Sequence, residues 1–185
     1  MKKKILSHTS TMIILTVILT FVAASFVMYD KFNSAMKKGV RDEAEYVKVG
    51  MEEAGDEYLN ENVGKATDTR ITLTDSEGNV LYDSEADASK LPNHSDRPEF
   101  IQAMENGQGE VVRYSETLSH QTFYYAVKLE DGKILRLAKT TDSVFHTLFS
   151  SFIWLGLLMI LIILVEIVLV QKQTQSLIAP VNNLD

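Results

Sequence analysis

Cysteine is absent from this sequence of 185 residues, and proline and tryptophan are scarce, with 3 and 1 occurrences. Without cysteine the chain cannot be a small fold stapled by disulfide bonds. With 9 glycines and 45% hydrophobic residues, it is neither collagen-like nor disordered. The composition instead suits one globular domain joined to additional segments.

Charged residues are missing from two long stretches. Residues 5–29 contain none, and residues 143–171 contain only Glu166. A helix needs about 20 residues to cross a hydrocarbon core of about 30 Å, and both stretches are long enough. We therefore predict transmembrane helices at residues 10–29 and 144–170.

Lysine residues flank these stretches on their outer sides. Lys2, Lys3 and Lys4 precede the first stretch, and Lys172 follows the second. The positive-inside rule places such residues in the cytoplasm. We therefore expect a multi-pass cell-membrane protein with two spans, both termini in the cytoplasm, and residues 30–143 in an extracytoplasmic position.

A cleaved signal peptide is the alternative for the first stretch, because Val22-Ala23-Ala24 before Ser25 is similar to a cleavage site. Signal peptides, however, have apolar regions of about 7 to 15 residues, and this uncharged run is longer. A retained anchor in membrane lipid is the interpretation we favour.

The segment between the two spans is strongly acidic. Residues 30–143 hold 14 Lys+Arg against 23 Asp+Glu, a net charge of -9. This charge excludes nucleic acid as a natural partner, since the phosphate backbone would be repelled.

Glu166 is the one ionisable residue inside a predicted span. Such residues are functional candidates by default, so a polar contact across a helix dimer that takes part in signalling is one interpretation. The alternative is that its side chain reaches the cytoplasmic interface, because Lys172 follows about 9 Å further along a helix.

Apolar residues recur at helical spacing directly after the first span. The stripe consists of Phe32, Met36, Val40, Ala44, Val47, Met51, Ala54 and Tyr58. Spacings of three and four predict one face of a long amphipathic helix. We expect this helix to pair with its twin in a homodimer.

The period then changes from helical to alternating. The predicted elements are strands at 71–74 and 80–82, a short helix at 97–104 with Asp96 as N-cap and Pro98 in its first turn, and strands at 110–118, 122–130 and 133–140. The last three strands should form an antiparallel meander. The predicted fold class is α+β, with a five-stranded antiparallel sheet and a long N-terminal helix, flanked by two transmembrane helices.

This element order resembles that of extracytoplasmic PAS-like sensor domains, also called PDC or single Cache domains. The segment Asn93-His94-Ser95-Asp96-Arg97-Pro98-Glu99 resembles the corresponding region of phosphate-regulon-type sensor histidine kinases of Gram-positive bacteria. Segments 70–73 and 80–84 resemble the same proteins, so the resemblance covers roughly residues 70–140. It implies a sensor domain that faces away from the cytoplasm.

The final residues, QKQTQSLIAPVNNLD, resemble the opening of a HAMP linker, with Pro180 shortly before the apolar Leu184. The resemblance implies a signalling role for Pro180. The predicted organisation is a cytoplasmic tail at 1–9, spans at 10–29 and 144–170, a sensor domain at 30–143, and the start of a HAMP linker at 171–185.

No motif for catalysis occurs in the sequence. A histidine kinase needs a nucleophilic histidine beside an acidic residue and a glycine-rich ATP site with Mg²⁺ ligands. None of the four histidines is followed by an acidic residue, and no GxGxxG or HExxH occurs. We expect this chain to be inactive alone and without a cofactor, with ATP and Mg²⁺ bound only in a kinase domain that it lacks.

A ligand site is predicted between the sheet and the short helix. Arg97 offers a bidentate guanidinium to an anion, aided by His94 and by Tyr82 or Tyr124. The alternative is an internal ion pair of Arg97 with a nearby acid. The acidic run of Asp83, Glu85 and Asp87 is interpreted as a solvated loop in preference to a cation site.

Together these features predict the input module of a two-component sensor histidine kinase, of the phosphate-regulon type by resemblance. The partners expected are a second copy of the chain, an extracytoplasmic ligand or envelope protein, and a response regulator reached through other domains. The alternatives are the input module of a chemoreceptor or a cyclase, or a membrane-anchored adaptor.

Overall fold

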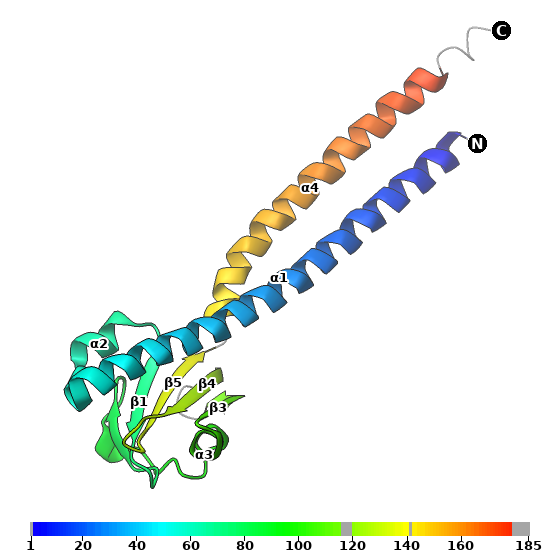
Figure 1. Ribbon diagram of the computed structural model, residues 1–185. Coiled ribbons are helices and arrows are strands. Elements are labelled where there is room, and N and C mark those ends of the chain that lie inside the picture. The colour runs from blue at the N-terminus through cyan, green and yellow to red at the C-terminus, as the bar shows by residue number, and fades with distance from the viewer. Residues whose placement is uncertain (1, 116–119, 141, 179–185) are drawn as a thin grey trace, which may run out of the picture. The chain divides into compact units, whose positions relative to one another are not determined.

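The computed structural model describes residues 2–115, 120–140 and 142–178 (Figure 1). By internal contacts the chain divides into two units. Residues 1–31 and 146–185 form one unit, and Phe32–Phe145 forms the other. Two segments, Ser7–Tyr58 and Ser151–Val170, are long and apolar enough to cross a membrane, judged by length and composition. Pro180 lies outside the described residues.

The elements follow the predicted order. They are α1 (Lys2–Ala54), η1 (Gly55–Tyr58), α2 (Glu61–Ala66), β1 (Arg70–Thr74), β2 (Val80–Asp83), η2 (Ala88–Lys90), α3 (Pro98–Asn106), β3 (Gln108–Ser115), β4 (His120–Lys128), β5 (Ile134–Thr140) and α4 (Asp142–Ile178). The first helix is continuous from the predicted span into the second unit. Its apolar stripe therefore belongs to the same helix as the first uncharged stretch.

The five strands form one antiparallel sheet in the order β2-β1-β5-β4-β3. The β3-β4-β5 meander is the predicted one, and β1 joins the β1–β2 hairpin to it by pairing with β5, with Ile71 opposite Leu137. The α+β class, the five-stranded antiparallel sheet and the long N-terminal helix are thereby confirmed.

One face of the sheet is covered by α1, as Figure 1 shows for the cyan part of that helix. Val40, Ala44, Val47 and Met51 are buried there. The residues of the sheet and of the turn after β4 that share this core are Ile71, Leu73, Phe123, Tyr125, Val127, Leu129, Leu135 and Leu137. Because side chains alternate along a strand, every second residue of β4 and β5 faces α1.

This packing gives the apolar stripe of α1 a different role from the one expected. Val40 and Val47 are 1% and 4% exposed, because they lie against the chain's own sheet. They are therefore not available to a second copy. Another side of the helix remains exposed, where Tyr46 and Val49 are 77% and 53% accessible.

The opposite face of the sheet is covered by α3. Phe100 and Ala103 pack there against Ala126 and Ile134. The helix ends at Gly107, whose positive φ of 82° allows its N–H to bond the carbonyl oxygen of Ala103 at 2.9 Å. The prediction that Asp96 caps this helix is wrong. Arg97 occupies the N-cap position without a side-chain cap, and Asp96 forms an ion pair with it instead.

The β1–β2 hairpin holds the loop that leads into α3. The side-chain nitrogen of Asn93 donates to the carbonyl oxygen of Glu77 at 2.9 Å, and His94 N–H donates to that of Gly78 at 2.8 Å. A Cβ on Gly78 would come within 2.4 Å of the Ser95 backbone nitrogen. The hairpin and this loop therefore fix the position of His94.

Candidate functional site

Charged side chains gather on the α3 side of the sheet. Arg70, Asp83, Arg113 and Arg136 come from β1, β2, β3 and β5, and Glu99 comes from the first turn of α3. We call these five residues the α3-side cluster. The four strand residues occupy positions that alternate with the apolar core residues, which places them away from α1.

Glu99 is the acidic centre of the cluster. Its side chain is fully buried, with 0% exposure. One carboxylate oxygen, Oε1, accepts hydrogen bonds from Arg113 Nη2 at 3.3 Å and from Arg136 Nη1 at 3.4 Å. The other oxygen, Oε2, is buried without a hydrogen-bond partner. Both contacts are long for bonds between charged groups, which are usually 2.7–2.9 Å.

A second, tighter ion pair lies beside the first. Arg70 Nε donates to both oxygens of Asp83, at 2.9 and 3.0 Å, and both side chains are almost fully buried. Thr72 connects the two pairs, because its hydroxyl accepts from Arg136 at 3.2 Å and donates to Asp83 at 2.8 Å. The cluster is thus one continuous polar network.

Tyr124 supplies the aromatic surface on which the cluster rests. The guanidinium carbon of Arg113 lies 4.2 Å from the ring centroid, and that of Arg136 lies 5.1 Å away. Both distances are within the range of cation–π attraction. The tyrosine is 4% exposed, so its ring forms a buried platform under the two guanidinium groups.

His94 is buried next to the cluster, with 5% of its surface exposed. Burial, together with the positive charges of Arg136, Arg97 and Arg70, lowers the pKa of His94 to about 3. The imidazole is therefore neutral at physiological pH, and it adds no charge to the site.

Burial also lowers the pKa of Arg136, an effect that the Glu99 carboxylate opposes. The side chain is 6% exposed. Because a guanidinium keeps its proton in proteins, we treat Arg136 as charged.

Three of the four predicted site residues come together. His94, Arg97 and Tyr124 lie on the α3 side of the sheet or at the start of α3. Arg97 is partly exposed, with its Nε 3.4 Å from Asp96 Oδ1. That separation is an ion pair but not a hydrogen bond, since the Nε has no hydrogen-bond partner.

Tyr82 lies on the other side. Its ring packs against the core under α1, and its hydroxyl donates to the Asn60 carbonyl oxygen at 3.3 Å. Phe123, the residue before Tyr124 in β4, also faces the α1 side. Tyr82 therefore does not join the other three predicted residues.

The most deeply buried charged residues of the site are not among the site residues predicted from the sequence. Glu99, Arg113 and Arg136 were not singled out from the sequence, nor was the pair of Arg70 with Asp83. A signal was present, because Arg70 and Thr72 alternate with Ile71 and Leu73 in one short strand. Polar residues at alternate positions of a strand indicate that its second face is not an ordinary apolar core.

The acidic run after β2 is part of the fold. Asp83 is buried in its pair with Arg70, and Asp87 caps η2 by accepting from Ser89 N–H at 3.1 Å. Among the described residues, no group of three or more histidine, aspartate or glutamate side chains is arranged to hold a metal ion.

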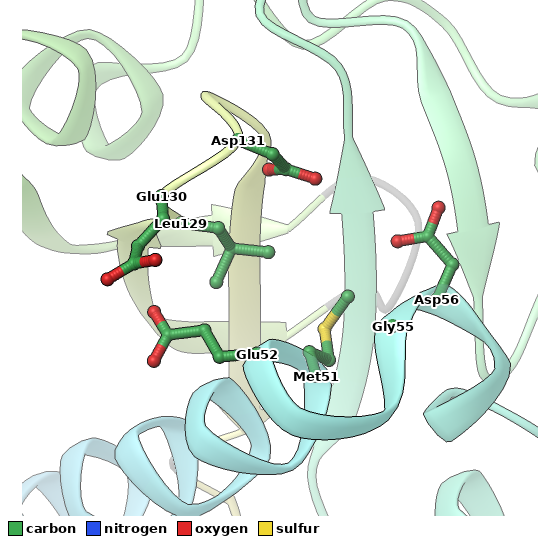
Figure 2. Close-up of a pocket in the computed structure, with 7 residues that line it drawn as sticks. All are labelled: Met51, Glu52, Gly55, Asp56, Leu129, Glu130 and Asp131. Atoms are coloured by element: carbon green, nitrogen blue, oxygen red, sulfur yellow. The ribbon is translucent and has the colours of Figure 1, made fainter.

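A separate pocket of about 200 Å³ lies at the end of α1, at the turn between β4 and β5 (Figure 2). Figure 2 shows the carboxylates of Glu52 and Glu130 beside each other, with Leu129 next to them. Asp56 and Asp131 also line this pocket, and Lys133 forms ion pairs with both. The pocket is therefore acidic, and two of its four carboxylates are paired with Lys133.

Glu166 lies in α4, in the unit formed by the two chain ends. It lines a small crevice of about 10 Å³ with apolar residues and Ser10. This position leaves both interpretations of Glu166 as predictions.

No protein with a curated description matches the chain. Among solved structures, the extracellular domain of rpHK1S-Z16, described as a histidine kinase, matches with a TM-score of 0.38 and 18% identity over 46% of this chain and 37% of that chain. The YkuI protein of Bacillus subtilis, which has an EAL domain and was solved with c-di-GMP and calcium, matches with a TM-score of 0.42 and 13% identity over 62% of this chain and 36% of that chain. The matched region thus spans little more than a third of either solved chain.

A family model covers α1 from residue 27 onward, β1 to β4 and α3, which build most of the sheet and of the cluster. The Single Cache-like model matches residues 27–134, which is more than half of the chain. The match begins in α1 and extends to the first residue of β5. This chain belongs to the Single Cache-like family.

Proposed function

We propose that the chain is the sensing and input module of a two-component sensor histidine kinase, with the domain at residues 30–143 in an extracytoplasmic position. The observation that carries this proposal is the α3-side cluster within a Single Cache-like domain. A buried polar network contributes less to stability than an apolar core, so its presence in this domain points to recognition.

The connection from the site to the membrane supports the same function. Arg136 belongs to β5, which ends at Thr140, and α4 begins at Asp142. A ligand that changes the contacts of Arg136 acts on the strand that leads directly into α4. Couplings between sites in signalling proteins are about 1–3 kcal/mol, within reach of one rearranged charge contact.

The finer parts of the proposal rest on the sequence. The phosphate-regulon type follows from the resemblance of residues 93–99, and a HAMP relay from that of 171–185. Through other domains the output would reach a response regulator. The same kind of input module also serves chemoreceptors and cyclases. The sequence of the output domain in the full-length protein distinguishes these alternatives from a histidine kinase.

A homodimer is part of the proposal, and we assign the pairing to the exposed side of α1. Phe32, Gly39, Tyr46 and Val49 are spaced by seven, seven and three residues, the period of a two-stranded coiled coil. Gly39 has open space where a Cβ would stand, which permits a close approach of helices.

Cysteine cross-linking in membranes tests this face. We expect Tyr46→Cys and Val49→Cys to form disulfide-linked dimers. Val47→Cys is the matched control, because Val47 lies on the side of α1 that is buried against the sheet, so this variant is expected to remain monomeric. Equal cross-linking at all three positions would contradict the assignment.

The function itself is tested in the full-length protein that contains this chain. Autophosphorylation is measured with wild type and with Arg136→Lys, which keeps the charge and loses the planar fork. We expect the basal phosphorylation level to change while a reporter placed at residue 77 stays extracytoplasmic. A reporter in the cytoplasm, or phosphorylation that is independent of the domain, would refute the proposed function.

A further inference from the structure

Buried polar atoms without partners are concentrated at one place. Six such side-chain atoms occur among the described residues, and five belong to the α3-side cluster or its neighbours. They are Nε of Arg97, Nε of Arg113, Nε of Arg136, Nδ1 of His94 and Oε2 of Glu99. Buried polar groups are nearly always hydrogen-bonded in native proteins, so such a concentration calls for a partner.

The charges of the same residues are not balanced. Arg70 and Asp83 neutralise each other, whereas Glu99 alone faces Arg113 and Arg136. His94 is neutral. With Arg97 paired to Asp96, a surplus of one positive charge therefore remains among the described residues of this site, inside a domain whose overall charge is strongly negative. An uncompensated buried charge is unfavourable, and a bound anion would compensate it.

Glu99 restricts which anion fits. An anion that approaches Arg113 and Arg136 also approaches the unpartnered Oε2 of Glu99. A negatively charged ligand oxygen in contact with Glu99 Oε2 is repelled by it unless a proton lies between the two oxygens. A ligand whose own O–H group donates to Oε2 removes the repulsion and satisfies the last unpartnered acceptor.

We propose that the α3-side cluster binds a small oxyanion that also carries a hydroxyl donor, with Arg113 and Arg136 holding the anionic oxygens and Glu99 accepting from the hydroxyl. This inference rests on the proposed sensing function and names the ligand chemistry of that site. Hydrogen phosphate and α-hydroxycarboxylates share this chemistry. Arg97 and Arg113 are 31% and 24% exposed, which leaves the cluster a connection to solvent.

Matched ligand pairs test the proposal with the full chain in lipid nanodiscs. Calorimetric binding at pH 7 is compared for phosphate against sulfate and for lactate against propionate. The two members of each pair are similar in size, and only the first member of each pair offers an O–H donor. We expect at least a tenfold tighter binding of the donor-bearing member in one pair, because a buried acceptor discriminates against an analogue that leaves it unpaired. The pair that shows it identifies the ligand as phosphate or hydroxycarboxylate.

Variants separate the two roles. Glu99→Gln should abolish the preference between pair members, because the amide can donate to the anion itself. Arg113→Gln should weaken both members at least tenfold. Arg41→Ala is the matched control, since Arg41 also pairs with a glutamate, Glu110, but on the α1 side. It should leave all affinities unchanged.

The wild-type comparison needs no variant, so it decides the proposal even where a variant fails to fold. Equal affinities within both pairs, or no heat of binding for phosphate and lactate at millimolar concentration, would overturn it. This assay contains no kinase. The autophosphorylation assay of the full-length protein is separate from it. If the ligand preference is present but the ligand does not change autophosphorylation, the sensing function alone is refuted. If the ligand changes autophosphorylation but the preference is absent, this inference alone is refuted.

Discussion

The two faces of the sheet are built from the same strands and differ in nearly every other respect. The face under α1 is apolar and closely packed, with Leu135 and Leu137 at 0% exposure. The face under α3 is as deeply buried, yet it carries Arg70, Glu99 and Arg136. Burial alone therefore does not distinguish a structural core from a recognition site.

The satisfaction of polar groups does distinguish the two faces. On the α1 side the Tyr125 hydroxyl donates to Gln108 Oε1 at 2.8 Å, although its ring lies in the core. On the α3 side several donors and one acceptor remain without partners. A buried face whose polar groups lack hydrogen-bond partners is expected to be stabilised more by a bound ligand than by its own packing.

The largest effect is expected on the apolar face. Leu137→Ala removes a fully buried side chain from the core under α1 and should lower the free energy of unfolding by about 2–5 kcal/mol. Hydrogen exchange of the β1 and β5 amides in the full chain measures this loss. The loss should be the same with and without phosphate or lactate, and a ligand-dependent loss would show that the two faces are not independent.

A comparable change on the charged face should respond differently. Arg136→Met leaves Glu99 with Arg113 alone, and removal of one partner from a buried pair costs about 3 kcal/mol. The double variant Arg136→Met, Glu99→Met restores an uncharged arrangement, so it should be less destabilised than the sum of the single variants. Strict additivity in hydrogen exchange would show that the two residues do not form a coupled pair.

Acid should weaken the charged face through His94. Its folded-state pKa of about 3 lies below the usual value of 6.5, so the unfolded chain takes up the proton first as the pH falls. The contribution of neutral His94 to the free energy of unfolding is complete above pH 6.5 and declines toward pH 3, with about 2 kcal/mol lost at pH 5. We expect His94→Gln to have a smaller loss of stability between pH 7 and 5 than wild type. Identical pH profiles would show that the pKa of His94 is the same in the folded and unfolded states.

Local sequence patterns were sufficient for most of the fold. Alternation in residues 122–130 predicts which side of β4 forms the core, and the helical stripe after Phe32 predicts α1. The same stripe does not reveal its partner, because an apolar face is needed equally for packing on a sheet and for pairing with a second helix. Only the structure assigns it to the sheet.

The site was less predictable because it depends on contacts between distant strands. Arg97 and His94 stand out in one short segment, and Tyr124 in one strand. Glu99 meets Arg113 and Arg136 only after β3 and β5 have taken their places, across 14 and 37 residues. Tyr82 was grouped with the site because the face it occupies depends on the β1–β2 pairing, where a register irregularity follows Leu73. Strand register therefore limits the prediction of such sites.

The smallest effect on stability is expected for an arginine–glutamate pair on the α1 side. It has the same residue types as the pair of Arg113 with Glu99. Arg41 donates to both oxygens of Glu110 at 2.7 and 2.8 Å, a better geometry than that of Glu99, but both side chains are about 40% exposed. Water screens such a pair, so Arg41→Ala should cost only about 0.2–1 kcal/mol. Raising the salt concentration should remove most of this difference in hydrogen exchange. A loss as large as that of Arg136→Met would mean that geometry outweighs burial in this domain.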